Sequence, residues 1–174
     1  MTSPAGSTNR DLVTARLRLP LIDAAHVEAV LHGPRRAEWA EDYPAEGDVV
    51  VAERLWDRGM PAGGDAGYGK RLVVERSTGL VVGGCGFHAP PSGGSVEFGY
   101  GIVPSRQGRG YATEAAAELL RWALARRRVR EVVAHAEEGN ATSIRVLEKL
   151  GMRLRSREWP EVEYVATRDQ QARA

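Results

Sequence analysis

Cysteine is nearly absent from this chain, which has a single one, Cys85, in 174 residues. One thiol cannot form an intrachain disulfide framework or a cysteine-based zinc site, and such scarcity is typical of a reducing compartment. Because Cys85 lies in the apolar run Val-Gly-Gly-Cys-Gly-Phe, we expect a buried structural thiol and not a nucleophile. We therefore predict a cytoplasmic protein and no metal site.

Long apolar runs and a charge excess are missing as well. No run approaches the roughly 18 apolar residues that a membrane-spanning helix needs, and the net charge is only +1. We therefore expect neither a membrane nor a nucleic acid as a partner. Because the first ten residues are polar, we predict a flexible N-terminus at 1–10 and a single domain at 11–170.

The spacing of apolar and turn-forming residues predicts seven strands and four helices. The strands are expected at 12–19, 70–76, 80–88, 95–103, 130–136, 152–159 and 162–168. The helices are expected at 24–32, 49–59, 110–127 and 140–150, with caps at Asp23, Asp48 and Asn140. This order predicts an α+β fold, in which a central mixed, largely antiparallel sheet of about seven strands is flanked by about four helices.

The stretch 96–113 has the pattern of a phosphate-binding turn. An apolar strand leads into a turn rich in glycine and arginine, and an alanine-rich helix follows. Gly108 and Gly110 leave backbone N–H groups uncovered, and the helix N-terminus adds free N–H groups with partial positive charge. Arg106 and Arg109 add full positive charges. The pattern predicts a phosphorylated ligand.

Two nucleotide classes fit this turn poorly. A nucleoside-triphosphate loop needs Gly-Lys-Ser/Thr, whereas Gly110 is followed by Tyr111 and Ala112. A dinucleotide fingerprint needs a third glycine where Thr113 stands, and its ribose-binding acid should end a strand, whereas Glu131 begins one. A nucleotide-dependent oxidoreductase stays open as an alternative.

A third class matches more closely. The residues Gln-Gly-Arg-Gly-Tyr-Ala at 107–112 resemble the acyl-coenzyme A signature Q/R-x-x-G-x-G/A of the GNAT superfamily of N-acetyltransferases. Residues 97–100 look like the preceding strand in the branch that acetylates ribosomal-protein N-termini and small amines. The stretches 14–19 and 140–152 are similar to the first strand and the second motif of that branch. In the family's element order, the resemblance covers residues 12–168.

This resemblance implies that acetyl-coenzyme A is the cosubstrate and lies between the strands at 96–103 and 130–136. Backbone N–H groups of 107–112 would hold the pyrophosphate, and an N–H around Val103 would polarise the thioester carbonyl. A primary amine would attack directly, without a covalent enzyme intermediate. The implied cofactor contacts are Ile102, Val103, Gln107, Gly108, Arg109, Gly110, Tyr111, Ala112, Asn140 and Ser143.

Glu97 is the general base that we expect. It shares one face of its strand with Gly99 and Gly101, which leave backbone open either to a ligand or to close packing. His88 and His135 are alternatives for the base, although a lone strand histidine is more often structural. A carboxylate beside two glycines is the arrangement that favours Glu97.

The resemblance implies Ser143 as the acid that protonates the departing thiolate. Many family members use a tyrosine seven residues after the motif asparagine, which is Asn140 here, and this chain has Leu147 at that position. The missing tyrosine leaves a second function class open, a non-catalytic acyl-coenzyme A-binding or sensing module. Thiol release in the presence of amines would distinguish the enzyme from such a module.

The loop 35–47 and the first two helices usually form the acceptor wall in this family. Trp39 and Tyr43 stand in the loop among several acids, a combination that attracts a cationic amine and holds it against aromatic faces. We therefore expect Trp39, Asp42, Tyr43 and Glu97 to bind the acceptor, which would be a protein N-terminus or a cationic small-molecule amine. A solvated acidic loop is the alternative. The residues leave both a monomer and a homodimer open.

Overall fold

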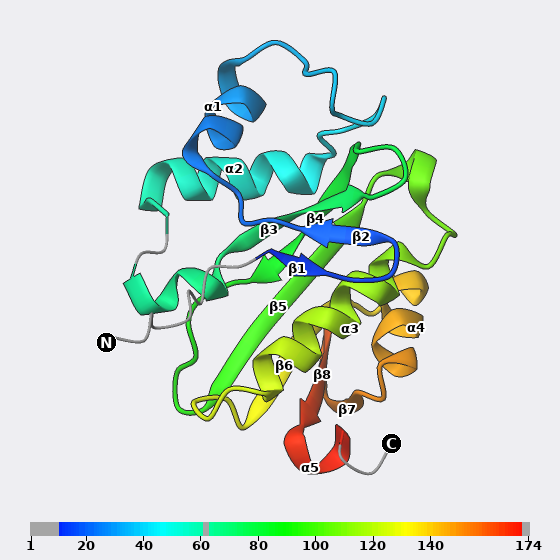
Figure 1. Ribbon diagram of the computed structural model, residues 1–174. Coiled ribbons are helices and arrows are strands. Elements are labelled where there is room, and N and C mark those ends of the chain that lie inside the picture. The colour runs from blue at the N-terminus through cyan, green and yellow to red at the C-terminus, as the bar shows by residue number, and fades with distance from the viewer. Residues whose placement is uncertain (1–10, 61–62, 172–174) are drawn as a thin grey trace.

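The computed structural model describes residues 11–60 and 63–171, so the flexible segment expected at 1–10 lies outside the described residues. The strands form an eight-stranded sheet in the order β1-β2-β3-β4-β5-β6-β8-β7 (Figure 1). The strands are β1 Leu12–Val13, β2 Leu17–Leu19, β3 Lys70–Glu75, β4 Val81–Phe87, β5 Ser95–Ile102, β6 Glu131–Glu137, β7 Arg153–Glu158 and β8 Glu161–Thr167. The helices are α1 Ala24–His32, α2 Glu46–Arg58, α3 Tyr111–Leu124, α4 Ala141–Lys149 and α5 Arg168–Gln171, with short 3-10 helices η1 Gly63–Tyr68 and η2 Pro104–Arg106.

The α+β class and the mixed, largely antiparallel sheet are confirmed, with two local differences. The strand expected at 12–19 is split into β1 and β2 by a turn, in which the N–H of Thr14 donates to the carbonyl of Leu17. The N–H of Arg16 in this turn donates to the Glu114 carboxylate instead of to a strand. The sheet therefore has eight strands, and α5 adds a helix after the last one.

The start of α2 corrects the expectation for Asp48. The N-cap of α2 is Ala45, so Asp48 is not the cap but lies in the first turn of the helix. Its Oδ2 accepts a hydrogen bond from the Ala45 N–H at 3.0 Å. The other two predicted caps are confirmed: the side chain of Asp23 accepts from the His26 N–H, and that of Asn140 accepts from the Ser143 N–H.

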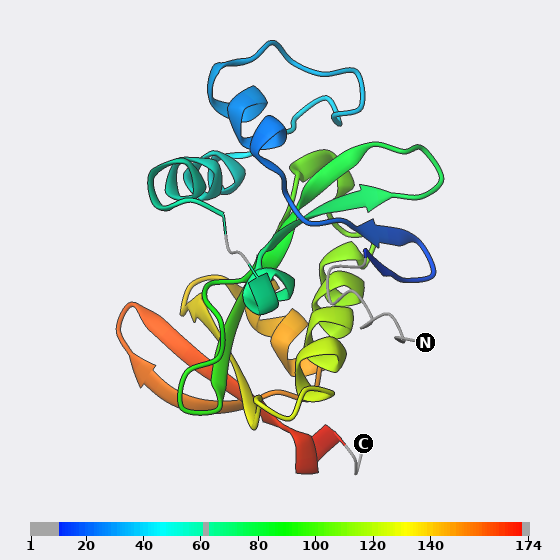
Figure 2. The same cartoon turned by 60° about the vertical axis from the view of Figure 1, so that its left-hand side comes forward.

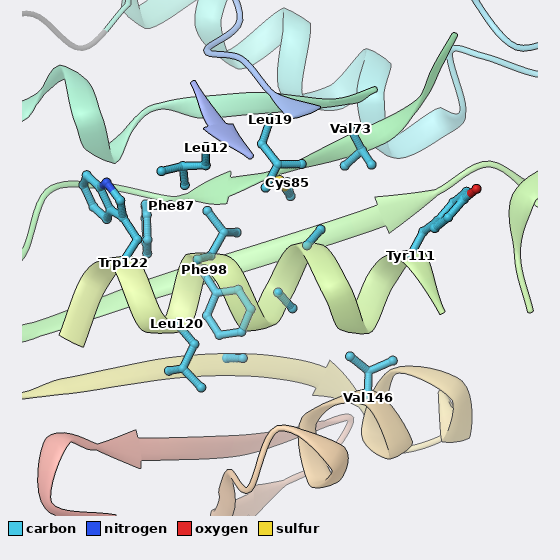
Figure 3. Packing of buried hydrophobic residues seen from close by; sticks show 14 of the residues in the cluster. Leu12, Leu19, Val73, Cys85, Phe87, Phe98, Tyr111, Leu120, Trp122 and Val146 are labelled. Atoms are coloured by element: carbon cyan, nitrogen blue, oxygen red, sulfur yellow. The ribbon is translucent and has the colours of Figure 1, made fainter. Parts of the chain in front are cut away.

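Helices cover both faces of the sheet. α1 and α2 lie on one side of the strands, and α3 and α4 lie on the other (Figure 2). On the α3 side of the core, Phe87, Phe98 and Trp122 pack together with the alanine and leucine side chains of the helix (Figure 3). Trp39 and Tyr43, which contact His26 of α1, belong to the same buried cluster. Cys85 is buried, as expected, and burial raises the pKa of its thiol to about 12.

Among the described residues, no helix has both the length and the apolar character that crossing a bilayer requires.

Candidate active site

The sheet opens between β5 and β6. These two parallel strands pair only at Ser95–Glu131, Val96–Val132 and Glu97–Val133. Beyond that point β5 continues against β4 as far as Ile102, and β6 continues against β8 as far as Glu137. The C-terminal halves of β5 and β6 therefore diverge, and within the described part of the chain the facing edge of β5 has no strand partner along 98–102.

The pairing of β4 with β5 fixes which backbone groups face this gap. The N–H of Val103 donates to the Val82 carbonyl at 2.9 Å, and the N–H of His88 donates to the Glu97 carbonyl at 2.9 Å. Because hydrogen-bonding directions alternate along an antiparallel strand, the N–H groups of Tyr100 and Ile102 point away from β4 and into the gap. The N–H of Val103 is thus engaged in the sheet. Of the N–H groups around Val103 that were expected to polarise a thioester, that of Ile102 faces the gap.

The turn that follows β5 has the backbone of an anion cradle. Gly108 and Gly110 have φ of +75° and +80°, the left-handed region that favours glycine. A Cβ added at Gly108 would meet no atom within 4 Å, so that side of the turn is open. Gly110 is the N-cap of α3, so the first N–H groups of this 14-residue helix face the same region. This backbone suits the pyrophosphate that the sequence predicted at 107–112.

A buried carboxylate braces the cradle. Glu75 of β3 accepts hydrogen bonds from the Thr78 hydroxyl at 2.6 Å and from the Tyr111 hydroxyl. These two hydrogen bonds hold the pKa of Glu75 below its ordinary value. Arg106 and Arg109 lie 3.9 and 3.6 Å from the same carboxylate, and the side chain of Arg109 is still half exposed. Tyr111 therefore turns its side chain into the core, while Arg109 stays available to an anion.

Four further side chains fix the edges of the gap. The Gln107 amide donates to the Ile102 carbonyl at 2.9 Å and so fixes the end of β5. On the far side, the hydroxyls of Tyr100 and Ser143 lie 3.1 Å apart, and Tyr100 also donates to the Ser143 carbonyl at 3.2 Å. Asn140 caps α4 beneath them. The predicted residues Gln107, Asn140 and Ser143 thus flank the gap together with Tyr100, which the sequence did not single out.

A cavity of about 300 Å³ lies between the α1–α2 side and strands β3 to β5. Its apolar lining includes Val27, Val30, Val51 and Ala52. Its polar and glycine lining includes His26, Tyr43, Asp48, Lys70, His88, Gly84, Gly99 and Gly101. Burial raises the pKa of Asp48 to about 6. The cavity, called the amine cavity below, reaches the same strand, β5, that forms one edge of the gap.

His88 connects the amine cavity with Glu97. The Nδ1 atom of His88 lies 3.0 Å from Glu97 Oε1, and its Nε2 atom would lie 3.0 Å from a Cβ at Gly99. His135 of β6 also places Nδ1 3.0 Å from Glu97 Oε1, and its Nε2 is 3.3 Å from Glu163. Burial, followed by the nearby Lys70 charge, lowers the pKa of His88. His88 lines the cavity directly, whereas Glu97 contacts it through the histidine.

The residues expected to hold a cationic acceptor occupy different places. Trp39 is 5% exposed and packs edge-on against Tyr43, with ring centroids 5.4 Å apart. Tyr43 lines the amine cavity and shares a 2.8 Å hydrogen bond with His26. Both oxygens of Asp42 accept from Ser105, at 2.8 Å from its N–H and 2.7 Å from its hydroxyl. Asp42 therefore fastens the loop 35–47 to the cradle side of the molecule.

Sequence reasoning missed Asp48 and Lys70 as site residues, and gave His88 little weight. No local sequence pattern places Asp48 against Gly84, where a Cβ would lie 2.8 Å from Asp48 Oδ1. The hairpin register between β4 and β5 would have paired His88 with Glu97. The position of Lys70 beside them has no local sequence signal, since it depends on the pairing of β3 with β4.

Comparisons with known proteins agree with this geometry. The model of the acetyltransferase (GNAT) domain matches residues 16–153. The uncharacterized N-acetyltransferase YjdG of Bacillus subtilis (strain 168) is 32% identical over 151 residues, which cover 80% of this chain and 88% of YjdG.

Solved structures share the fold. A GNAT-family acetyltransferase from Bacillus anthracis has a TM-score of 0.68 at 20% identity, over 92% of this chain and 99% of its own. RimL, a ribosomal L7/L12 α-N-protein acetyltransferase in complex with coenzyme A, has a TM-score of 0.63 at 20% identity, over 92% of this chain and 99% of its own. At such identities the structures show the fold alone. The family model and the identity to YjdG go further: this chain belongs to the GNAT family of acetyl-coenzyme A-dependent N-acetyltransferases.

Proposed function

We propose that this enzyme acetylates a primary amine by direct attack of the amine on the thioester of acetyl-coenzyme A. The observation that carries the proposal is the position of β5, whose residues 99–102 border the amine cavity on one side and the gap toward β6 on the other. A new N–C bond forms as the C–S bond breaks, and the amine proton leaves. Cys85, with its buried thiol and raised pKa, supplies no nucleophile for an acyl-enzyme.

His88 acts as the base in this proposal, with Glu97 as the group that positions it. If Nδ1–H donates to Glu97, Nε2 of a neutral His88 keeps its lone pair toward the cavity. The lowered pKa of His88 favours that neutral form near pH 7. Glu97, expected from the sequence as the base itself, then stabilises the imidazolium that forms on His88, while His135 holds the same carboxylate from the side of β6.

The departing thiolate receives its proton from the Tyr100–Ser143 pair. Burial raises the pKa of Tyr100, so its phenol stays protonated, and its 3.1 Å contact lets Ser143 pass on a proton. Leu147, at the position of the family tyrosine, is fully buried. Tyr100 of β5 supplies a phenol where many family members have a tyrosine at the position of Leu147 in α4. This phenol favours an enzyme over a non-catalytic binding module.

The cradle and the N–H of Ile102 complete the site. The N–H groups of 107–112 and Arg109 would hold the pyrophosphate, and the Ile102 N–H would stabilise negative charge on the thioester oxygen. A protein N-terminus and a small-molecule amine both remain candidates for the acceptor. A specifically cationic acceptor has less support, because Trp39 is buried and Asp42 is bound to Ser105. The cytoplasmic location and the monomer or homodimer state stay predictions from the sequence.

Calorimetric titration with acetyl-coenzyme A, coenzyme A, NAD and ATP, followed by thiol-release assays with amines, tests this function. We expect selective binding of the coenzyme A species and amine-dependent thiol release, which Glu97→Gln and Ser143→Ala reduce. Binding of NAD in preference would favour the oxidoreductase alternative. Binding of coenzyme A without thiol release for any amine would favour the non-catalytic module.

A further inference from the structure

We propose that the acceptor amine also carries a carboxylate, which binds in a cationic pocket formed by Arg54, Arg58 and Lys70 beside the amine cavity. This inference rests on the proposed function and names the chemical class of its acceptor.

The cationic pocket is a second cavity, of about 220 Å³, between α2 and strands β3 and β4. Arg54 and Arg58 lie one helical turn apart on α2 and both line it, together with Lys70 from β3. Lys70, His88 and Val51 also line the amine cavity, so the two cavities adjoin. An acceptor can therefore reach from one to the other within a few bonds.

The three cations of this pocket have no carboxylate partner among the described residues. In the described ranges, 11–60 and 63–171, no ion pair includes Arg54, Arg58 or Lys70. The two arginines are exposed to water, whereas Lys70 is partly buried. Burial, with a contribution from the charge of Arg54, disfavours the charged form of Lys70 and lowers its pKa to about 8. A half-buried cation without a partner is unfavourable, and a bound carboxylate would remove that penalty.

The dipole of α2 accounts for only part of this cationic cluster. Arg58 is the last residue of α2, where a cation interacts favourably with the helix dipole. That reason does not extend to Lys70, which comes from a strand and is more buried than a solvated lysine. The convergence of two elements on one cavity is what indicates a ligand.

Charge also fixes the orientation of the acceptor. Asp48 lines the amine cavity and not the cationic pocket, so a carboxylate in the amine cavity would face a like charge. The amine therefore lies near His88 and Asp48, and the carboxylate near Lys70 and the arginines. A free amino acid has this chemistry, and so does a peptide N-terminus followed by an acidic residue.

Matched acceptor pairs test the inference. One arm compares free amino acids with their amides, and the other compares the peptide amides Ser-Glu-NH₂ and Ser-Gln-NH₂. Thiol release gives kcat/KM for each, and calorimetry gives binding to the complex with coenzyme A. Each is measured for the wild type, for Arg54→Ala/Arg58→Ala, and for Arg127→Ala, an exposed arginine that lines neither cavity.

We expect a carboxylate to raise kcat/KM about tenfold or more in one of the arms, and the arm that responds identifies the source. The double variant should lose this preference and keep its coenzyme A affinity, whereas Arg127→Ala should keep both. If amines are acetylated without a carboxylate preference, or if the preference survives the double variant, the inference fails and the proposed function stands. If coenzyme A binds but no acceptor is acetylated, calorimetry decides. Tighter binding of the acceptor with a carboxylate, lost in the double variant, supports the pocket, and the absence of such binding overturns the inference. No coenzyme A binding overturns both.

Discussion

Replacing Gly101 by alanine should separate activity from stability. Gly101 has a negative φ, and a Cβ there would meet no atom within 4 Å. The added methyl group would therefore cause no strain and would project into the amine cavity, which Gly101 lines. This is the space in which we expect the amine and the acetyl group to meet.

The expected sizes follow from that geometry. An unstrained glycine-to-alanine change stabilises a protein by about 0.4–1 kcal/mol, because it restricts the unfolded chain. For a chain of this length, that corresponds to a rise in Tm of roughly 1–4 °C. Displacing a reacting group by about the size of a methyl lowers kcat/KM by about 10- to 100-fold. Gly101→Ala should thus be slightly more stable and much less active.

Thermal unfolding by calorimetry and thiol-release kinetics measure the two quantities on the same preparation. Gly139→Ala is the matched control, because its Cβ also meets nothing within 4 Å but lines no part of the cavity. A Gly101→Ala enzyme with wild-type kcat/KM would show that the acceptor does not pass over this part of β5. A lower Tm would show that the position is not open.

Three other results are expected. Gly108→Ala should weaken coenzyme A binding by about 5- to 30-fold, because its φ of +75° costs an alanine about 1–2 kcal/mol and the free turn would relax out of the conformation that binds. Calorimetric titration measures this, and unchanged affinity would place the pyrophosphate elsewhere. Glu97→Gln should shift the acidic limb of the pH profile of kcat/KM to lower pH, because the carboxylate raises the pKa of His88; loss of the limb would mean that Glu97 itself is the base. For carboxylate acceptors, KM should increase as pH rises through about 8, since Lys70 loses its charge there, and an equal increase for neutral amines would contradict the assignment.

Local patterns in the sequence predicted much of the fold and the backbone of the cradle, which is one half of the candidate site. The caps at Asp23 and Asn140 and the glycines of the cradle depend on neighbouring residues, and they are where the sequence placed them. Asp48 was predicted as a cap because it precedes an apolar run, but Ala45 starts the helix and Asp48 faces Gly84 of a distant strand. That contact depends on how α2 lies on the sheet.

The other half of the site comes from pairing between strands. The N–H of Val103 is occupied by Val82 of β4, and the partners of Glu97 are His88, just after β4, and His135 of β6. Asp42 looked like part of an acidic surface, yet its partner Ser105 is 63 residues away in the chain. Apart from His88 and Glu97, which share a hairpin, these partners are far apart in the sequence. Composition alone therefore suggested a cationic acceptor that the observed contacts support less.

The short pairing of β5 with β6 has a consequence for folding. Three residue pairs join the β1–β5 half of the sheet to the β6–β8 half, and beyond them side-chain contacts such as Tyr100–Ser143 and Glu97–His135 link the two halves. A ligand that bonds to the edge of β5 and packs against β6 would couple them, and at 100 times its Kd it adds about 2.7 kcal/mol to the stability. The amide protons of Tyr100 and Ile102 should then exchange with solvent quickly in the free enzyme and slowly when coenzyme A is bound, as though the cosubstrate were the strand that the sheet lacks.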